Sequence, residues 1–159
     1  MEEKQLIERA TAEKFLQLFN QEFGVDYAIV ELANSPDVKC RDSVGTSLNL
    51  EITLTEDRPG DLQASLGRSN SRSVENRNSA RASSLRDNVL EQAKGRIKTK
   101  LCNSYGSNTA LIVRDTSGVD WDWDFVIDDL KSELESVQNQ FDRGVWILGQ
   151  FGTKLYRIT

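Results

Sequence analysis

The feature that most constrains the fold is an alternation of apolar and polar residues over residues 48–54, which read LNLEITL. Leucine or isoleucine occupies every second position, and Asn49, Glu51 and Thr53 stand between them. Successive side chains of a β-strand point to opposite faces of a sheet. This pattern therefore predicts a strand that has one face in an apolar core and one polar face.

The segment before this strand alternates in the same way, and a short turn that contains glycine joins the two. A hairpin that turns at Val44–Gly45 places Lys39 opposite Asn49. The same register places Asp37 opposite Glu51. Like charges that face each other directly destabilise a pair of strands. The predicted hairpin therefore calls for a positive group between the two carboxylates.

Three interpretations of the two carboxylates remain open. In the first, Lys39 and Arg41 neutralise them on an exposed sheet face, an arrangement that adds little stability. In the second, Asp37 is a turn residue after Pro36, whose ring fixes an extended start to the strand. In the third, Asp37, Glu51 and a backbone carbonyl between them bind a hard, oxygen-preferring cation such as Mg²⁺.

Apolar periodicity predicts the other elements and gives the chain the order αβββαβαββ. This order is typical of an α/β fold in which helices flank a mixed central β-sheet. A length of 159 residues suits one domain, and we expect residues 1–159 to form a single one. Outside the hairpin, we predict helices over 4–22, 83–101 and 121–141 and strands over 26–32, 109–113, 144–149 and 153–158.

Residues 66–82 differ in composition from the rest of the chain. They are rich in arginine, serine and asparagine and contain almost nothing to bury. Two interpretations are open: a mobile loop or insertion that only connects two elements, or a basic flap that contacts the phosphates of a nucleic acid. The arginines that the second interpretation assigns to nucleic-acid binding are Arg68, Arg72, Arg77 and Arg81.

Composition excludes several classes of site. The chain has no histidine, which leaves carboxylates and lysines for acid–base or metal chemistry. Its net charge of −5 does not by itself favour nucleic-acid binding. No apolar run reaches the roughly 18 residues of a membrane-spanning helix, so no membrane partner is expected. The acidic N-terminal segment is unlike a secretory signal and favours a cytoplasmic location.

The order of elements and the positions of two acids resemble the PD-(D/E)xK, or restriction-endonuclease-like, nuclease superfamily. The resemblance rests on a first helix that carries Glu8, the dipeptide Pro36-Asp37, a glycine-containing turn, and Glu51 in an apolar strand. It extends over residues 4–113, which match the αβββαβ core of that family. The predicted C-terminal helix and β-hairpin correspond to elements that members of the family append.

The resemblance implies a metal site and assigns residues to it. Asp37 matches the aspartate of the family motif, and Glu51 matches its second acid. With the backbone carbonyl of Ile52, these two carboxylates would hold Mg²⁺ or Mn²⁺. Glu8, on the first helix, would be the optional third acid.

One position departs from the family motif, because Thr53 stands where the family has its lysine. That lysine orients or deprotonates the attacking water and stabilises charge on the phosphate. In relatives that lack it, the function often moves to the helix after the third strand, which here carries Lys94, Lys98 and Lys100. We predict Lys100 as the displaced catalytic lysine, from its IxxKL spacing, and Lys98 as the second choice. Lys39 is a further alternative.

The resemblance therefore implies a Mg²⁺-dependent or Mn²⁺-dependent nuclease that hydrolyses phosphodiester bonds in DNA. The alternative is a catalytically inactive member of the fold that serves as a nucleic-acid-binding or protein-interaction module. A third class, a protein that binds a partner through its acidic surface, also stays open. A homodimer is expected from the habit of the family alone.

Overall fold

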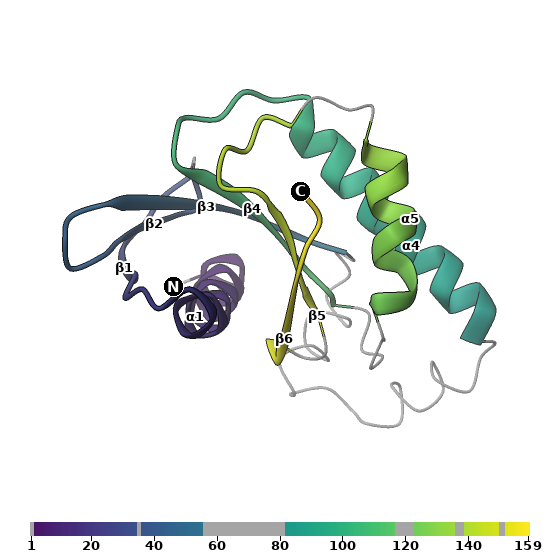
Figure 1. Ribbon diagram of the computed structural model, residues 1–159, viewed down its shortest axis with the longest axis horizontal. Coiled ribbons are helices and arrows are strands. Elements are labelled where there is room, and N and C mark those ends of the chain that lie inside the picture. Colours follow the sequence, from purple (N-terminus) through teal and green to yellow (C-terminus); the bar gives the residue numbers. More distant parts are fainter. Residues whose placement is uncertain (1, 35, 56–81, 117–122, 136–138, 150–151) are drawn as a thin grey trace.

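The computed structural model describes residues 2–34, 36–55, 82–116, 123–135, 139–149 and 152–159 (Figure 1). For residues 82–90 and for Phe125, it describes the backbone alone. The four arginines predicted to bind nucleic acid, Arg68, Arg72, Arg77 and Arg81, lie outside these residues, so their role stays a prediction.

The described residues form a mixed α/β fold built on a six-stranded sheet, as predicted. The strands follow one another across the sheet in chain order. Strands β3, β4 and β5 run parallel, and the remaining neighbours are antiparallel. The strands are β1 (Ala28–Leu32), β2 (Val38–Arg41), β3 (Ser47–Leu54), β4 (Thr109–Arg114), β5 (Val145–Gly149) and β6 (Lys154–Arg157); the helices are α1 (Glu3–Phe23), α4 (Ala82–Leu101) and α5 (Asp124–Leu134).

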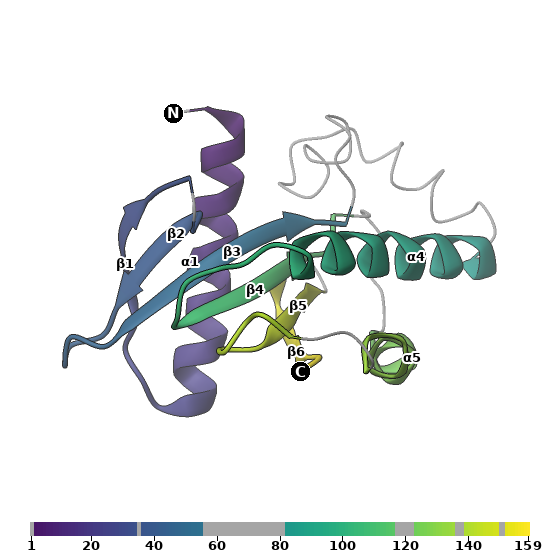
Figure 2. The same cartoon turned by 90° about the horizontal axis from the view of Figure 1, so that it is seen from above.

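The helices form two layers with the sheet between them (Figures 1 and 2). Helix α1 covers one face, and α4 and α5 cover the other. Each face buries its own apolar cluster, and burial of this kind is the main favourable contribution to folding. The cluster under α1 includes Phe15, Leu16, Leu48, Leu50, Ile112 and Trp146; the cluster under α4 and α5 includes Ile97, Leu111, Val113, Trp123, Leu130 and Ile147.

The predicted hairpin forms with the predicted register, since Lys39 pairs with Asn49 in the antiparallel β2–β3 ladder. The turn is stabilised by the side chain of Asp42, which accepts hydrogen bonds from the backbone N–H groups of Val44 and Thr46 at 3.1 and 2.7 Å. Gly45 has a φ of +97°, a conformation that favours glycine. Local turn chemistry and the apolar alternation therefore specify the same register.

One predicted helix needs correction. The helix predicted over 121–141 is shorter, because α5 ends at Leu134, and Phe141 is buried without being part of it. The polar face of β3 lies inside the molecule, since Glu51 and Thr53 are both buried. In the part of the chain that the structure describes, no helix is both long and apolar enough to span a membrane.

Candidate functional site

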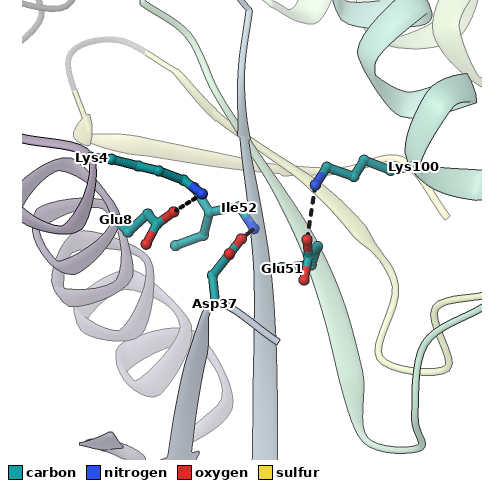
Figure 3. A network of polar contacts seen from close by, with 6 residues as sticks. All are labelled: Lys4, Glu8, Asp37, Glu51, Ile52 and Lys100. Atoms are coloured by element: carbon teal, nitrogen blue, oxygen red, sulfur yellow. Dashed lines mark hydrogen bonds and ion pairs between the residues drawn. The ribbon is translucent and has the colours of Figure 1, made fainter. Parts of the chain in front are cut away.

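The candidate site lies where β2 begins and β3 continues beyond it. The β2–β3 ladder begins with Val38 opposite Leu50, so the last residues of β3 extend past β2. Asp37, the residue just before β2, fills this position. Its Oδ2 accepts a hydrogen bond of 2.8 Å from the backbone N–H of Ile52 (Figure 3). Asp37 therefore pairs a strand N–H group that β2 no longer reaches.

Glu51 reaches the same region from β3 and is only 4% exposed. Lys100, near the C-terminal end of α4, donates a hydrogen bond of 2.8 Å to Glu51 Oε1. The second oxygen, Oε2, is buried and has no hydrogen-bond partner among the residues that the structure describes. A buried carboxylate oxygen without a partner is costly, which suits the site to a cation or a proton.

A third carboxylate comes from α1. Glu8 is 6% exposed, and Lys4 lies 3.4 Å from its Oε1, one helical turn earlier in the chain. Figure 3 shows Glu8, Asp37 and Glu51 on three elements, with Lys4 and Lys100 each reaching one of the glutamates. Burial raises the pKa of Glu8 above its ordinary value; the ion pair with Lys4 opposes the shift, and the charge of Glu51 adds to it.

The electrostatics of the cluster are dominated by burial. Burial raises the pKa of Asp37 to about 6; the hydrogen bond from Ile52 opposes this shift, and the charges of Glu51 and Glu8 add to it. Burial lowers the pKa of Lys100, but the hydrogen bond and charge of Glu51 outweigh this effect and leave the pKa above its ordinary value. The cluster thus contains three carboxylates and two lysines, so it carries an excess of negative charge when all three acids are ionised.

In metal-free buffer above pH 6, we expect Asp37→Asn to be more stable than the wild type by on the order of 2 kcal/mol. The pKa of Asp37 is 3.8 without the effect of folding and about 6 in the folded protein. Between pH 3.8 and about 6, the folded state therefore binds a proton that the unfolded state has lost. The wild type therefore loses stability as the pH rises through this window, whereas an amide does not titrate. An asparagine oxygen can still accept the hydrogen bond from Ile52.

Thermal unfolding in EDTA at a series of pH values measures this difference. The control is Asp128→Asn, an exposed position on α5, where a change within about 0.5 kcal/mol is expected. A gain that is equally large at pH 4 and pH 8, or equally large in the control, would contradict the assignment to Asp37.

A pocket of about 410 Å³ opens beside the cluster. One wall comes from the N-terminal part of α1 and the other from α4, and the end of β3 lies between them. Its lining residues are Glu3, Lys4, Ile7, Glu8, Asp37, Ile52, Thr53, Leu54, Arg96 and Lys100.

The predicted site residues divide clearly. Four of them line the pocket: Asp37, Glu8, Ile52 and Lys100. Glu51 is not a lining residue, but it accepts the hydrogen bond from Lys100. Lys98 is exposed on α4 and is not one of the lining residues.

The other lysines considered from the sequence lie in different ion pairs. Lys94 contacts Glu91 and Glu133 at 2.7 and 3.6 Å. Lys39 lies 3.8 Å from Glu31. The first interpretation of the carboxylates, in which Lys39 neutralises them on an exposed face, is therefore wrong: the partner of Glu51 is Lys100, and both acids are buried.

Two cations of the pocket were not predicted from the sequence. Lys4 and Arg96 both line it, on α1 and α4 respectively. Each precedes a predicted site residue by four positions, Lys4 before Glu8 and Arg96 before Lys100, and residues so spaced share a helix face. That spacing is the signal that could have found them.

The chemical type of the ligand atoms suits a hard divalent cation, but the number of side chains that supply them is small. Asp37 and Glu51 supply carboxylate oxygens, including the unpartnered Oε2, and oxygen is the ligand that Mg²⁺ prefers. Among the described residues, no group of three or more His, Cys, Asp or Glu side chains lies close enough together to hold a metal ion. Comparisons with protein-family models, with curated proteins and with solved structures found no match for this chain.

Proposed function

We propose that this protein is a Mg²⁺-dependent nuclease of the PD-(D/E)xK type that hydrolyses phosphodiester bonds in DNA. The observation that carries the proposal is the contact between Lys100 and Glu51, whose atoms Nζ and Oε1 lie 2.8 Å apart. This contact supplies a lysine from α4 beside the second acid of the motif. A lysine from elsewhere is needed because Thr53 occupies the position of the motif lysine.

The arrangement of elements supports the same proposal. Helix α1, the antiparallel strands β1, β2 and β3, helix α4 and the parallel strand β4 follow the αβββαβ order of the restriction-endonuclease-like core. Glu51 lies on β3, Asp37 immediately precedes the neighbouring strand β2, and Glu8 comes from the first helix of this unit. The C-terminal helix α5 and strands β5 and β6 extend that core.

The residues present fit a divalent cation. Asp37 and Glu51, with the backbone carbonyl of Ile52, would hold it, and the unpartnered Oε2 of Glu51 is a free ligand atom for it. A bound Mg²⁺ supplies Lewis-acid polarisation of the phosphate and lowers the pKa of a bound water.

The side chains of the chain itself have distinct roles in this proposal. Glu51 keeps the pKa of Lys100 above its ordinary value, so Lys100 stays protonated. In the proposed reaction, the ammonium group of Lys100 donates a hydrogen bond to the phosphate oxygen on which negative charge develops. Asp37 holds β3 in place through its bond to Ile52. Glu8, whose pKa is raised by burial, accepts or gives a proton at its carboxyl oxygens.

A second candidate is a catalytically inactive protein of the same fold that binds nucleic acid or a protein partner. One observation favours it: both acids have partners within the protein itself, since Lys100 pairs with Glu51 and Asp37 accepts a hydrogen bond from the Ile52 N–H group. A buried ion pair of this kind can persist for structural reasons alone.

The two candidates are separated by incubating purified wild-type protein with labelled single-stranded and duplex DNA in Mg²⁺, in Mn²⁺ and in EDTA. We expect cleavage in either metal and none in EDTA, because the carboxylates alone do not polarise a phosphate. Divalent-ion binding is measured on the same preparation by calorimetry. Binding of DNA without cleavage in any metal would favour the inactive candidate, and no divalent-ion binding would reject the nuclease.

A further inference from the structure

Arg96 is a cation of the pocket that the proposed mechanism does not use. It lines the pocket from α4, together with Lys100. The two lysines that also line the pocket already form ion pairs: Lys4 lies 3.4 Å from Glu8, and Lys100 lies 2.8 Å from Glu51. Among the described residues, the Arg96 side chain has no ion-pair or hydrogen-bond partner. An unpaired guanidinium in a pocket is a ready donor for an anion.

The position of Arg96 relates it to the candidate site. It precedes Lys100 by one helical turn, so the two side chains share a face of α4 and lie about 6 Å apart along the helix axis. Lys100 reaches the carboxylates, whereas Arg96 lies farther from the end of α4 along the same wall. A phosphate at Arg96 would therefore be next to a phosphate at the carboxylates rather than at the same place.

The depth of the site restricts the form of DNA that can reach it. Asp37 and Glu51 are each 4% exposed, and the pocket beside them is lined by residues of α1 and of α4. These two helices lie on opposite faces of the sheet (Figure 1). Duplex DNA is stiff, with a persistence length of about 50 nm, so bending a short duplex to bring one phosphate into such a recess is energetically costly. A single strand is flexible and follows a groove with its backbone.

We propose that Arg96 binds a phosphate of a single DNA strand, adjacent to the scissile phosphate at the proposed metal site of Asp37 and Glu51, so that the substrate is single-stranded DNA or a single-stranded end. This inference rests on the proposed nuclease function and specifies its substrate class. The pocket of about 410 Å³ takes the reacting part of one strand, and Arg96 sets the position of that strand along α4.

The test measures DNA binding separately from cleavage. Fluorescence anisotropy with a labelled oligo-dT strand, and with a duplex of the same length, is recorded over a salt series. The buffer contains Ca²⁺, which takes oxygen ligands as Mg²⁺ does, and a gel confirms that the DNA stays intact. The variants are Arg96→Gln, Arg96→Lys and the control Arg9→Gln, which removes an exposed arginine of α1 that pairs with Glu13.

We expect the wild type to bind the single strand more tightly than the duplex. Arg96→Gln should weaken single-strand binding by about tenfold or more, because a charged hydrogen bond is lost. It should also reduce the slope of log K against log salt by about 0.7, the value for one phosphate contact on a single strand. Arg96→Lys keeps the charge and should retain the slope, and Arg9→Gln should leave both quantities unchanged.

Two results would overturn the inference: an Arg96→Gln protein that binds the single strand as the wild type does, or a wild type that prefers the duplex. If the wild type cleaves DNA in Mg²⁺ under either result, the nuclease function stands and only the substrate class is wrong. If no DNA is cleaved in any metal, the nuclease function is wrong, whatever the binding shows.

Discussion

Asp37→Asn and Glu51→Gln are each expected to reduce Mg²⁺-dependent DNA cleavage by more than about 100-fold while leaving the fold intact. Even a residue one step removed from a metal ligand typically contributes about 10–100-fold, so loss of a direct ligand should exceed this. Both substitutions keep the shape of the side chain, and an amide at position 37 can still accept the 2.8 Å hydrogen bond from the Ile52 N–H.

Single-turnover cleavage and calorimetric titration with Mn²⁺ measure this loss, and circular dichroism checks the fold. The matched control is Glu13→Gln, which removes an exposed glutamate on α1 whose partner is Arg9. Wild-type cleavage and Mn²⁺ affinity are expected for the control. Unchanged Mn²⁺ binding in both site variants would place the cation elsewhere.

Lys100→Met is expected to affect both stability and catalysis, and the two effects respond differently to metal. Without its ammonium group, Glu51 becomes a buried carboxylate with no counter-charge. Removal of one partner from a fully buried pair costs about 3–5 kcal/mol, and we expect a smaller loss here because 26% of the Lys100 side chain is exposed. A divalent cation can replace the missing charge, so Mn²⁺ should restore most of the melting temperature. It should not restore cleavage, which we expect to fall by about 10²–10³-fold through loss of a donor to the developing charge.

Thermal unfolding with and without Mn²⁺, and single-turnover cleavage, separate the two effects. Lys131→Met, an exposed lysine on α5, is the control for loss of a charge. Thr53→Lys in the Lys100→Met background should recover part of the activity, because Thr53 also lines the pocket. If Lys98→Met abolishes cleavage and Lys100→Met does not, the lysine has been assigned to the wrong position on α4.

The hairpin could be predicted because its determinants are local. Apolar residues at every second position, a glycine in the turn and Asp42 within the turn all specify one register, so the pairing of Lys39 with Asn49 followed from the sequence. The same pattern did not determine exposure. It predicted a polar face for β3, and the structure shows that Glu51 and Thr53 on this face are buried. Periodicity gives the side of a strand on which a residue lies, and the packing of distant elements decides what covers that side.

The position of Lys100 in the pocket also depends on contacts between elements that are distant in the sequence. The sequence placed Lys94, Lys98 and Lys100 on one helix, but the direction of each side chain depends on how α4 lies against the sheet. That orientation is set by contacts of Ile97 and Leu101 with strands and α5, which are far away in the sequence. Lys100 could be favoured from its spacing. The position of Arg96, four residues before Lys100, places both on one helix face, but that spacing gives the pocket position of Arg96 only once the position of Lys100 is known.

The chain order of the strands has a consequence for how the protein folds. Strands β1, β2 and β3 form a meander, and β5 and β6 form a hairpin, so these pairings close short loops. The β3–β4 pairing joins Asn49 to Thr109, and such distant contacts form slowly. Because the meander closes short loops, we expect it to bring Asp37 and Glu51 together before α4 docks with Lys100. If the site binds a divalent ion as proposed, that ion would then relieve the repulsion of the two carboxylates during folding, and refolding of the wild type should be faster with Mn²⁺ than in EDTA.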